Sequence, residues 1–353
     1  MRLGSLLVTA LVAFAAPHSG SRCRSEDAAV RRDWGDLSAD QRIEFIDALW
    51  CLRRTPSTLP HDQFPGVRDR YDDFVATHIN YTLSIHSSGL LLPWHRHFTW
   101  LFEKALQDEC GYTGSIPYWN WPLFTTNLSA SPVFDGSNTS LSGDGYLDHS
   151  NHKAVPACPR NVACRQGTGG GCIMAGPFQD WPKNMGPVDR KYYQSYGTLP
   201  PDVFAYTPGC VKRDFSLAYL QTQNTAAFVD AMLNTTNIVD FLQYMDPSES
   251  YLSGAHGSGH RGLGGMMDDP FSSPQDPAFF VHHSMVDRVW TIWQDKDFVN
   301  RRDQLNGTTI LFDPPGSPVV TLDTAMEWGY LDGPKRVVEV MDSRSGEYCY
   351  RYE

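Results

Sequence analysis

Two groups of histidines, three residues in each, limit the folds open to this 353-residue chain more than any other feature. The groups are His78, His86 and His95, followed much later by His256, His260 and His283. In the second group, His256 and His260 are four residues apart, so on a helix they project from one face about one turn apart. That spacing suits two ligands of one metal ion.

The first group needs more than one helix. Its spacings of eight and nine residues cannot come from one straight helix, because eight residues rise about 12 Å. We therefore expect His78 and His95 on two different helices and His86 on the connection between them. Three histidines of a helix–loop–helix can converge on one metal ion, and the second group on another.

Short helical patterns alternate with long irregular segments along the chain. Apolar residues recur at helical spacing in segments 38–52, 67–79, 94–108, 215–233, 239–245, 255–260 and 276–295. The region 118–214 is rich in Gly, Pro, Ser and Asn and carries half of the cysteines, so we expect disulfides to hold its long loops. The tail, 319–353, has the composition of one or two short strands. The pattern predicts one mainly helical domain, without repeats or a linker.

The N-terminus and the cysteines predict an oxidising compartment. Arg2, an apolar run over 6–16 and small residues after it are typical of a secretory signal peptide, which we place at 1–20, with the mature domain at 21–353. Eight cysteines form an even set without C-x-x-C spacing, so disulfides are expected and a zinc ribbon is not. Glycosylation signals occur at Asn80, Asn127, Asn138, Asn234 and Asn306. We expect a secreted glycoprotein.

The charge balance narrows the class of partner. Twenty-nine basic and 40 acidic side chains give a net charge of −11, which argues against nucleic acid and anionic membranes as partners. No stretch after the N-terminus reaches the ~18 apolar residues of a spanning helix. We expect a soluble protein.

The histidine groups favour copper over other metals, although imidazole alone suits copper, zinc, iron or nickel. A zinc protease would need Glu after its first histidine, where this chain has Gly257. A di-iron bundle would need Glu-x-x-His pairs, and a two-zinc hydrolase a bridging carboxylate; neither occurs in these motifs. Two all-imidazole sites fit copper that handles dioxygen, with core and surface histidines as the alternative. Gly257 and Gly259 predict a close approach of a substrate or a facing helix.

Several segments resemble signatures of the tyrosinase/catechol oxidase family. Segments 86–103 and 276–288 resemble the family's two copper signatures, and 256–266 matches the stretch that supplies the other two copper B ligands. Pro117–Trp121 resembles the Tyr-Trp-Asp-Trp element of the family, and Tyr350–Tyr352 resembles its Tyr-x-Tyr motif. In the Tyr-Trp-Asp-Trp element, Asn120 replaces the aspartate. The motifs span about 34 to 352, nearly the whole mature chain.

The resemblance implies a mainly α fold, with a central antiparallel four-helix bundle holding two copper ions, long disulfide-pinned loops and a few short strands. It implies that copper A is bound by His78, His86 and His95, and copper B by His256, His260 and His283. His282 and His97 fall outside this ligand set. The implied reaction oxidises a small phenolic substrate to an o-quinone and reduces dioxygen to water.

Two departures from the family pattern bear on which phenol is oxidised. Ser84 lies two residues before His86, so the Cys–His thioether of many relatives is absent. Gly257 stands where phenol-hydroxylating relatives often carry Asn, which is thought to hold a water with an upstream Glu; Gln243 or Glu249 would take the upstream place. Without Asn and that Glu, we expect oxidation of diphenols to dominate, since a phenol with a pKa of ~10 yields little phenolate at neutral pH.

Three more positions are candidates for roles around the copper ions. Arg261 follows His260 and would favour acidic phenols at the mouth of the site. Phe271 would lie over copper A as a gate. Asp287 would orient an imidazole or anchor Arg288, with a plain structural salt bridge as the alternative.

The sequence therefore predicts a secreted dicopper catechol oxidase of a short form that lacks a C-terminal shielding domain. The alternatives are a tyrosinase-type enzyme that hydroxylates monophenols or methoxyphenols and, less favoured, an oxygen carrier or a copper-free binding protein. The sequence leaves the oligomeric state open.

Overall fold

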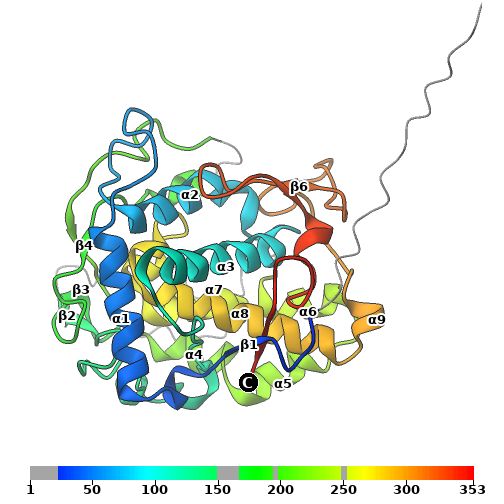
Figure 1. The fold of residues 1–353 in the computed structure, drawn as a ribbon, viewed down its shortest axis with the longest axis horizontal. Helices are drawn as coiled ribbons and strands as arrows, with labels where there is room; N and C mark the ends of the chain where they lie inside the picture. The colour runs from blue at the N-terminus through cyan, green and yellow to red at the C-terminus, as the bar shows by residue number, and fades with distance from the viewer. Residues whose placement is uncertain (1–22, 149–166, 194–197, 248–252) are drawn as a thin grey trace, which may run out of the picture.

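The computed structural model describes residues 23–148, 167–193, 198–247 and 253–353. The fold is mainly helical (Figure 1). Its helices are α1 (Ala39–Arg54), α2 (Arg70–Ile85), α3 (Leu91–Cys110), α4 (Leu217–Gln223), α5 (Ala226–Leu233), α6 (Ile238–Met245), α7 (Gly254–Leu263), α8 (Ala278–Asp295) and α9 (Phe298–Arg301). No helix in the described ranges is both long and apolar enough to cross a bilayer.

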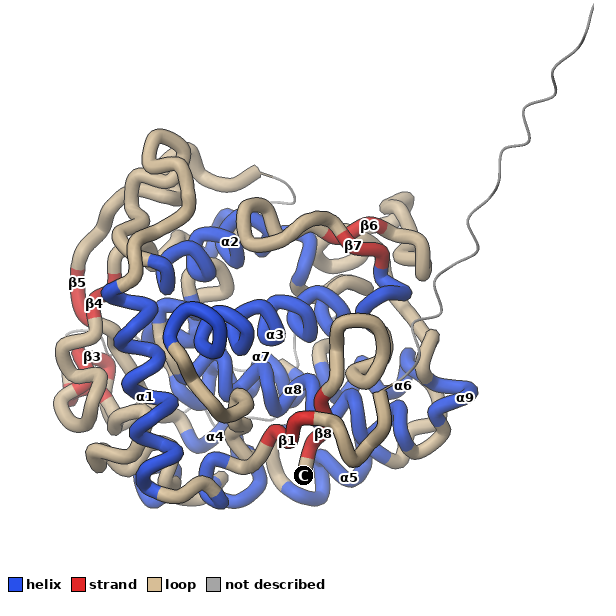
Figure 2. Tube along the Cα trace, viewed as in Figure 1, coloured by secondary structure: helices blue, strands red, loops and turns tan. Residues whose placement is uncertain are grey.

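The strands are short and most of the chain outside the helices is loop (Figure 2). They form four two-stranded sheets: β1 (Ala29–Arg31) with β8 (Tyr350–Tyr352), β2 (Gly145–Leu147) with β3 (Gly170–Ile173), β4 (Pro182–Lys183) with β5 (Gly209–Cys210), and β6 (Ala325–Met326) with β7 (Lys335–Arg336). Only the β1–β8 pair among these is parallel. The tail, in which we expected one or two short strands, contains three: β6, β7 and β8.

Helices α2, α3, α7 and α8 form the central bundle that carries both histidine groups. Figure 1 shows α3 and α8 side by side through the middle of the molecule, with α7 beside them, and α2 and α7 contact α3 and α8, respectively. The bundle is packed with aromatic rings; Phe102 of α3 and Phe280 of α8 stack with ring centroids 3.4 Å apart. This confirms the predicted fold class.

Local capping explains where the first helices begin. Ser38 caps α1: its Oγ accepts a hydrogen bond from the backbone N–H of Gln41, and the Gln41 side chain accepts one from the N–H of Ser38. Helix α2 begins at Arg70 rather than 67, because the Asp69 carboxylate accepts the N–H of Asp72 at 3.0 Å and sets the first turn.

The predicted helix over 215–233 is two helices, α4 and α5. The Asn224 side chain donates to the carbonyl of Ala255, and the hydroxyl of Thr225 accepts the N–H of Phe228 and so caps a new helix. Side chains that bond to the backbone in this way compete with a continuous helix, which apolar periodicity does not reveal.

Three disulfides pin the described chain: Cys23–Cys349, Cys51–Cys110 and Cys172–Cys210. The last of them joins two parts of the long Gly/Pro-rich region, as the composition predicts. Cys158, Cys164 and the predicted signal peptide lie outside the described residues.

Asp287 of α8 lies in a buried charged cluster that joins the bundle to strands β1 and β8. Its carboxylate accepts hydrogen bonds from Arg96 (2.6 Å) and Arg31 (3.3 Å) and from the hydroxyls of Tyr350 (2.7 Å) and Tyr352 (2.6 Å). The expectation that it orients an imidazole or anchors Arg288 is wrong, and the structural salt bridge is present instead. The reason is topological: β1 and β8 bring Arg31 and the two tyrosines onto α8.

Candidate metal centre

The first three histidines meet at one end of the α2–α3 hairpin. His78 projects from α2, His86 is the residue at which α2 ends, and His95 projects from the first turns of α3. Their ligand nitrogens lie within 4.8 Å of one another, and all three side chains are buried. The His86 backbone is extended (φ −121°, ψ 148°), so the chain leaves the helix there and turns the imidazole back toward the other two.

The second three histidines come from α7 and α8. His256 and His260 lie one turn apart on α7, and His283 projects from α8 against them. Nε2 of His260 is 3.2 Å from Nε2 of His283. Two ligand atoms that share one metal ion at about 2.0–2.1 Å in near-tetrahedral geometry are about 3.3 Å apart, so this pair has the spacing of a shared ion.

The two groups face each other. The rings of His95 and His283 stack with centroids 4.3 Å apart, and those of His86 and His256 are nearly parallel at 6.1 Å. The bundle therefore holds two three-imidazole sites side by side.

Backbone and carboxylate acceptors fix the tautomers of these rings. In four rings the Nδ1–H group donates to a backbone carbonyl: that of Phe271 for His78 (2.8 Å), Thr82 for His86 (3.0 Å), Leu91 for His95 (2.8 Å) and Met267 for His260 (2.8 Å). The Nδ1–H group of His256 donates to the Asp246 carboxylate (3.1 Å). The hydrogen on Nδ1 leaves Nε2 with a free lone pair. In His78, His95 and His256 this Nε2 is buried without any hydrogen-bond partner.

Burial favours the neutral form, which is the form that binds a metal ion, in five of these imidazoles: those of His78, His86, His95, His260 and His283. Desolvation lowers the pKa of His78, His95, His260 and His283 well below the usual 6.5, and neighbouring histidines lower it further. Desolvation and the nearby His256 lower the pKa of His86 to about 4. At neutral pH, a cluster of unprotonated, partnerless buried nitrogens fits metal ions, and the all-imidazole donor set fits copper.

Two further histidines of the bundle are already satisfied. His282 accepts a hydrogen bond from the Trp121 indole on Nδ1 (3.1 Å) and donates from Nε2 to the His256 carbonyl (3.0 Å). His97 bonds Asp332 through Nε2 (2.9 Å) and the Tyr348 hydroxyl through Nδ1. Neither has a nitrogen free for a metal ion, which agrees with their predicted place outside the ligand set.

The two glycines of α7 serve different purposes. A Cβ at Gly259 would lie 2.2 Å from Cε1 of His282, so the predicted close approach is that of the facing helix α8. A Cβ at Gly257 would meet only the Cβ of Ser253, at 3.2 Å, and Gly257 lines a cavity. Gly257 therefore leaves space beside His256.

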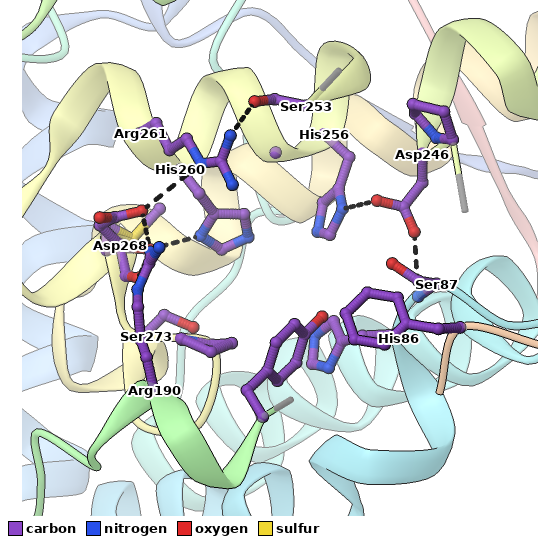
Figure 3. Close-up of a pocket in the computed structure, with 16 residues that line it drawn as sticks. His86, Ser87, Arg190, Asp246, Ser253, His256, His260, Arg261, Asp268 and Ser273 are labelled. Carbon is purple, nitrogen blue, oxygen red and sulfur yellow. Dashed lines mark hydrogen bonds and ion pairs between the residues drawn. The ribbon is translucent and has the colours of Figure 1, made fainter. Parts of the chain in front are cut away.

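A cavity of about 210 Å³ leads from the surface to the histidines. Its lining includes His86, His256 and His260 at the base, Tyr193, Phe312, Met267 and Pro270 on its walls, and Arg190, Arg261, Asp246 and Asp268 as charged groups. Figure 3 shows Asp246 between His256 and Ser87, and Arg190 and Arg261 converging on Asp268. Arg190 donates to the Asp268 carboxylate at 2.5 Å, and Nε of Arg261 lies 3.8 Å from it.

The other predicted residues divide into those inside and those outside this cavity. Arg261 lines it, as expected, and donates to Ser253. Phe271 is fully buried and is not among the lining residues, because its segment turns inward to present its carbonyl to His78; the expectation of a gate at Phe271 is wrong. Gln243 is exposed on α6 and does not reach the cavity. Glu249 lies outside the described residues.

Sequence reasoning missed the residue that occupies the upstream position. Asp246 directly follows α6, where the backbone leaves the helix (φ −155°, ψ 75°), so its side chain turns toward His256 while Gln243 stays on the solvent face. Tyr193 and Phe312 were also missed, since they come from irregular segments without a periodic signal.

Comparisons with known proteins agree on one kind of protein. A sequence profile of the common central domain of tyrosinase matches residues 68–296. Tyrosinase P of Aspergillus terreus is 47% identical over 336 residues, covering 94% of this chain and 93% of that protein. The N-acetyl-6-hydroxytryptophan oxidase of Emericella nidulans is 43% identical over 366 residues, covering 99% of this chain and 98% of that protein. A solved polyphenol oxidase variant from Thermothelomyces thermophila superposes with a TM-score of 0.85 at 34% identity, covering 94% and 90% of the two chains.

Proposed function

Because this chain belongs to the tyrosinase family of dicopper oxidases, we propose that it oxidises o-diphenols to o-quinones with dioxygen as the electron acceptor. The observation that carries the proposal is the pair of facing three-imidazole sites at the base of a cavity open to the surface. The cavity is large enough for a small aromatic ring and brings it directly to His86, His256 and His260.

In this proposal His78, His86 and His95 hold copper A, and His256, His260 and His283 hold copper B. The copper pair supplies the redox chemistry, taking electrons from the phenol and passing them to dioxygen. The protein contributes fixed ligand orientation. Backbone carbonyls accept a hydrogen bond from four of the six rings, and the Asp246 carboxylate accepts one from His256. The sixth ring, His283, packs against His95 and Phe279.

The lack of a polar side chain at position 257, next to His256, favours diphenols over monophenols as substrates. Gly257 offers no side chain to hold a water molecule for deprotonating a phenol. Asp246 is the nearest carboxylate, and both of its oxygens already accept hydrogen bonds, Oδ1 from His256 and Oδ2 from the backbone of Ser87. We propose that it holds the His256 ring rather than removing the substrate proton. Hydroxylation of monophenols or methoxyphenols is the alternative.

The arginines at the cavity favour phenols that carry an acidic group. Arg190 and Arg261 share a single carboxylate, that of Asp268, so this corner of the cavity has a surplus of positive charge. The relative named N-acetyl-6-hydroxytryptophan oxidase acts, by its name, on a phenol that bears a carboxylate. We propose an anionic phenol as substrate, with the acid group near Arg190 and Arg261 and the hydroxylated ring at the histidines.

Secretion and glycosylation belong to the same proposal. The five predicted acceptor asparagines, Asn80, Asn127, Asn138, Asn234 and Asn306, are all exposed, so each is sterically open to a glycan. The disulfides are consistent with an extracellular protein.

Oxygen consumption tests the reaction. The copper-loaded protein is given catechol, phenol and guaiacol in parallel, with chelator-treated protein as the control. We expect oxygen uptake with catechol and at least about tenfold slower uptake with phenol and guaiacol. Uptake with phenol at a similar rate would establish the hydroxylating alternative, and no uptake with any of them would refute an oxidase in favour of an oxygen carrier.

Acid preference is measured separately. The value of kcat/KM is compared for 3,4-dihydroxybenzoate and catechol in the unaltered protein and in Arg190→Gln and Arg261→Gln. We expect the ratio of the acidic to the neutral substrate to fall about fivefold or more in each variant, because one charged hydrogen bond is lost. Equal ratios in all three proteins would remove the arginines from substrate recognition.

A further inference from the structure

Two residues that line the cavity have a backbone conformation that L side chains rarely adopt. Ser87 has φ +40° and Phe312 has φ +63°. The two are joined directly, since the N–H of Phe312 donates to the carbonyl of Ser87 at 2.9 Å. Left-handed backbone at a bulky aromatic residue is unfavourable and persists only where the surroundings hold it.

The surroundings that hold Phe312 include the metal centre itself. The N–H of Ser87 donates to Oδ2 of Asp246 at 3.0 Å, and Oδ1 of the same carboxylate accepts from His256 at 3.1 Å (Figure 3). Ser87 also directly follows His86. One chain of hydrogen bonds therefore fixes Phe312 relative to a histidine of each three-imidazole site.

The segment that carries Phe312 is braced on both sides. The N–H of Leu311 donates to the carbonyl of Leu83 on α2 at 3.0 Å. The next residue, Asp313, also has a positive φ, +48°, and its Oδ1 accepts from the backbone N–H and the hydroxyl of Thr308 at 2.5 and 2.9 Å. These contacts hold the turn in one conformation, so the position of the Phe312 ring is set by the fold.

The Phe312 ring is part of an aromatic wall, which we define as Phe312 and Tyr193. The two rings meet edge to face with centroids 5.4 Å apart, and the Tyr193 ring lies 6.2 Å from that of His86. Phe271, the gate expected from the sequence, lies 6.0 Å from Tyr193 and outside the cavity lining. The wall is thus the aromatic surface that a substrate ring passes on its way to His86.

We propose that Phe312 is a specificity-determining residue that limits the bulk of the phenols admitted to the histidines. The inference rests on the proposed phenol oxidation. A rigid ring on one side of a cavity of about 210 Å³ leaves room for a single substituted ring, and substituents on the side of the wall meet Phe312. The strained backbone is retained because it aims this ring at the cavity.

The test uses catechol and 4-tert-butylcatechol with the copper-loaded full chain. In Phe312→Ala and Phe312→Gly we expect kcat/KM for the bulky substrate relative to catechol to rise about tenfold. Ile310→Ala is the matched control: Ile310 lies two residues away in the same turn but does not line this cavity, so its ratio should stay that of the unaltered protein.

Thermal unfolding gives a second, independent measurement. Both substitutions remove the ring, but only glycine adopts φ +63° without strain, so the Gly variant should unfold at a higher temperature than the Ala variant. A purely structural Phe312 would lower stability in both variants and leave the substrate ratio unchanged, and that result would overturn the proposal.

The outcome can be separated from a failure of the proposed reaction. If the unaltered protein oxidises neither of the two substrates, the proposed function is wrong. The size limit is then measured by calorimetric binding of benzoate and 4-tert-butylbenzoate. The inference is supported if Phe312→Gly lowers the dissociation constant of 4-tert-butylbenzoate relative to that of benzoate. A ratio that stays the same, or no binding of either ligand to any of the proteins, refutes it.

Discussion

At the scale of single residues, Gly257 decides how much polarity the cavity offers beside His256. The Cβ of a larger residue would meet only Ser253 at this position, so an amide side chain fits on the cavity side with a small movement of its neighbour. An amide there would place a hydrogen-bonding group next to the site where a phenol approaches His256.

Gly257→Asn should therefore raise hydroxylation of phenol relative to oxidation of catechol by about tenfold or more, because a positioned water acts as a base for the phenol proton. The two rates are compared by oxygen uptake, with Gly257→Ala as the control that adds a side chain without polarity. An unchanged ratio in the Asn variant would show that another position controls hydroxylation.

His260→Ala should lower the copper content by about one ion per chain and abolish oxidation of catechol, since two histidines remain for copper B. Circular dichroism should show an unaltered helical signal, because the other α7 contacts persist. Copper is measured by atomic absorption, with His61→Ala as the control, since His61 is exposed and belongs neither to the histidine clusters nor to the cavity lining. Full activity in His260→Ala would refute the ligand assignment.

The histidines could be predicted from the sequence, whereas the residues around them could not. Spacing along a helix fixes the relative directions of His256 and His260 before any tertiary contact exists. Asp246 reaches His256 only because α6 ends one residue earlier, and Phe312 reaches the cavity only through a left-handed turn. Both depend on backbone angles at single positions, which residue type does not determine.

At the scale of elements, the contact of α7 with α8 sets the distance between His256 and His260 on α7 and His283 on α8. Gly259 lets α8 approach until the His282 ring touches the α7 backbone and donates to the His256 carbonyl. The sequence predicted that the glycines allow a close approach, and the structure identifies the facing helix as the neighbour at Gly259. The break between α4 and α5 was not predictable from periodicity, because a single cap at Thr225 creates it.

Gly259→Ala should destabilise the fold by about 1–3 kcal/mol, because a Cβ there would lie 2.2 Å from His282 and force the helices apart. It should also weaken copper binding, since His283 moves with α8. Gly257→Ala on the same helix is the control, and it should be neutral or stabilising by up to about 1 kcal/mol. Urea unfolding of the two apo-proteins measures the difference; equal stabilities would contradict a packing role for Gly259.

At the scale of the whole molecule, Asp287 is the point at which the bundle meets strands β1 and β8. Burial alone would raise its pKa, but the charges of Arg96 and Arg31 outweigh burial, and the pKa lies below its usual value. The charged carboxylate is therefore favoured by folding. Its stabilising contribution is complete above the usual pKa of about 3.9 and is lost as the pH falls through the lowered folded-state pKa.

Asp287→Asn should cost about 3–5 kcal/mol at pH 7, because Arg96 would remain buried without its carboxylate, whereas Arg31 would keep Glu103 at 2.9 Å. The difference from the unaltered protein should shrink as the pH is lowered below about 3.9. Urea unfolding at several pH values measures both effects. Asp108→Asn, which removes an exposed ion pair with Lys104, is the control and should change stability by less than about 1 kcal/mol.

The parallel pairing of β1 with β8 also constrains the order of events during synthesis. A ribosome releases the chain from its N-terminus, so Arg31 and Arg96 emerge long before Asp287, Tyr350 and Tyr352, which complete their surroundings. Until then Arg31 has Glu103 as a carboxylate partner, whereas Arg96 lacks Asp287. Because α8 and β8 lie late in the sequence, we expect the helix bundle to close, and the two histidine groups to meet, only after these elements have left the ribosome.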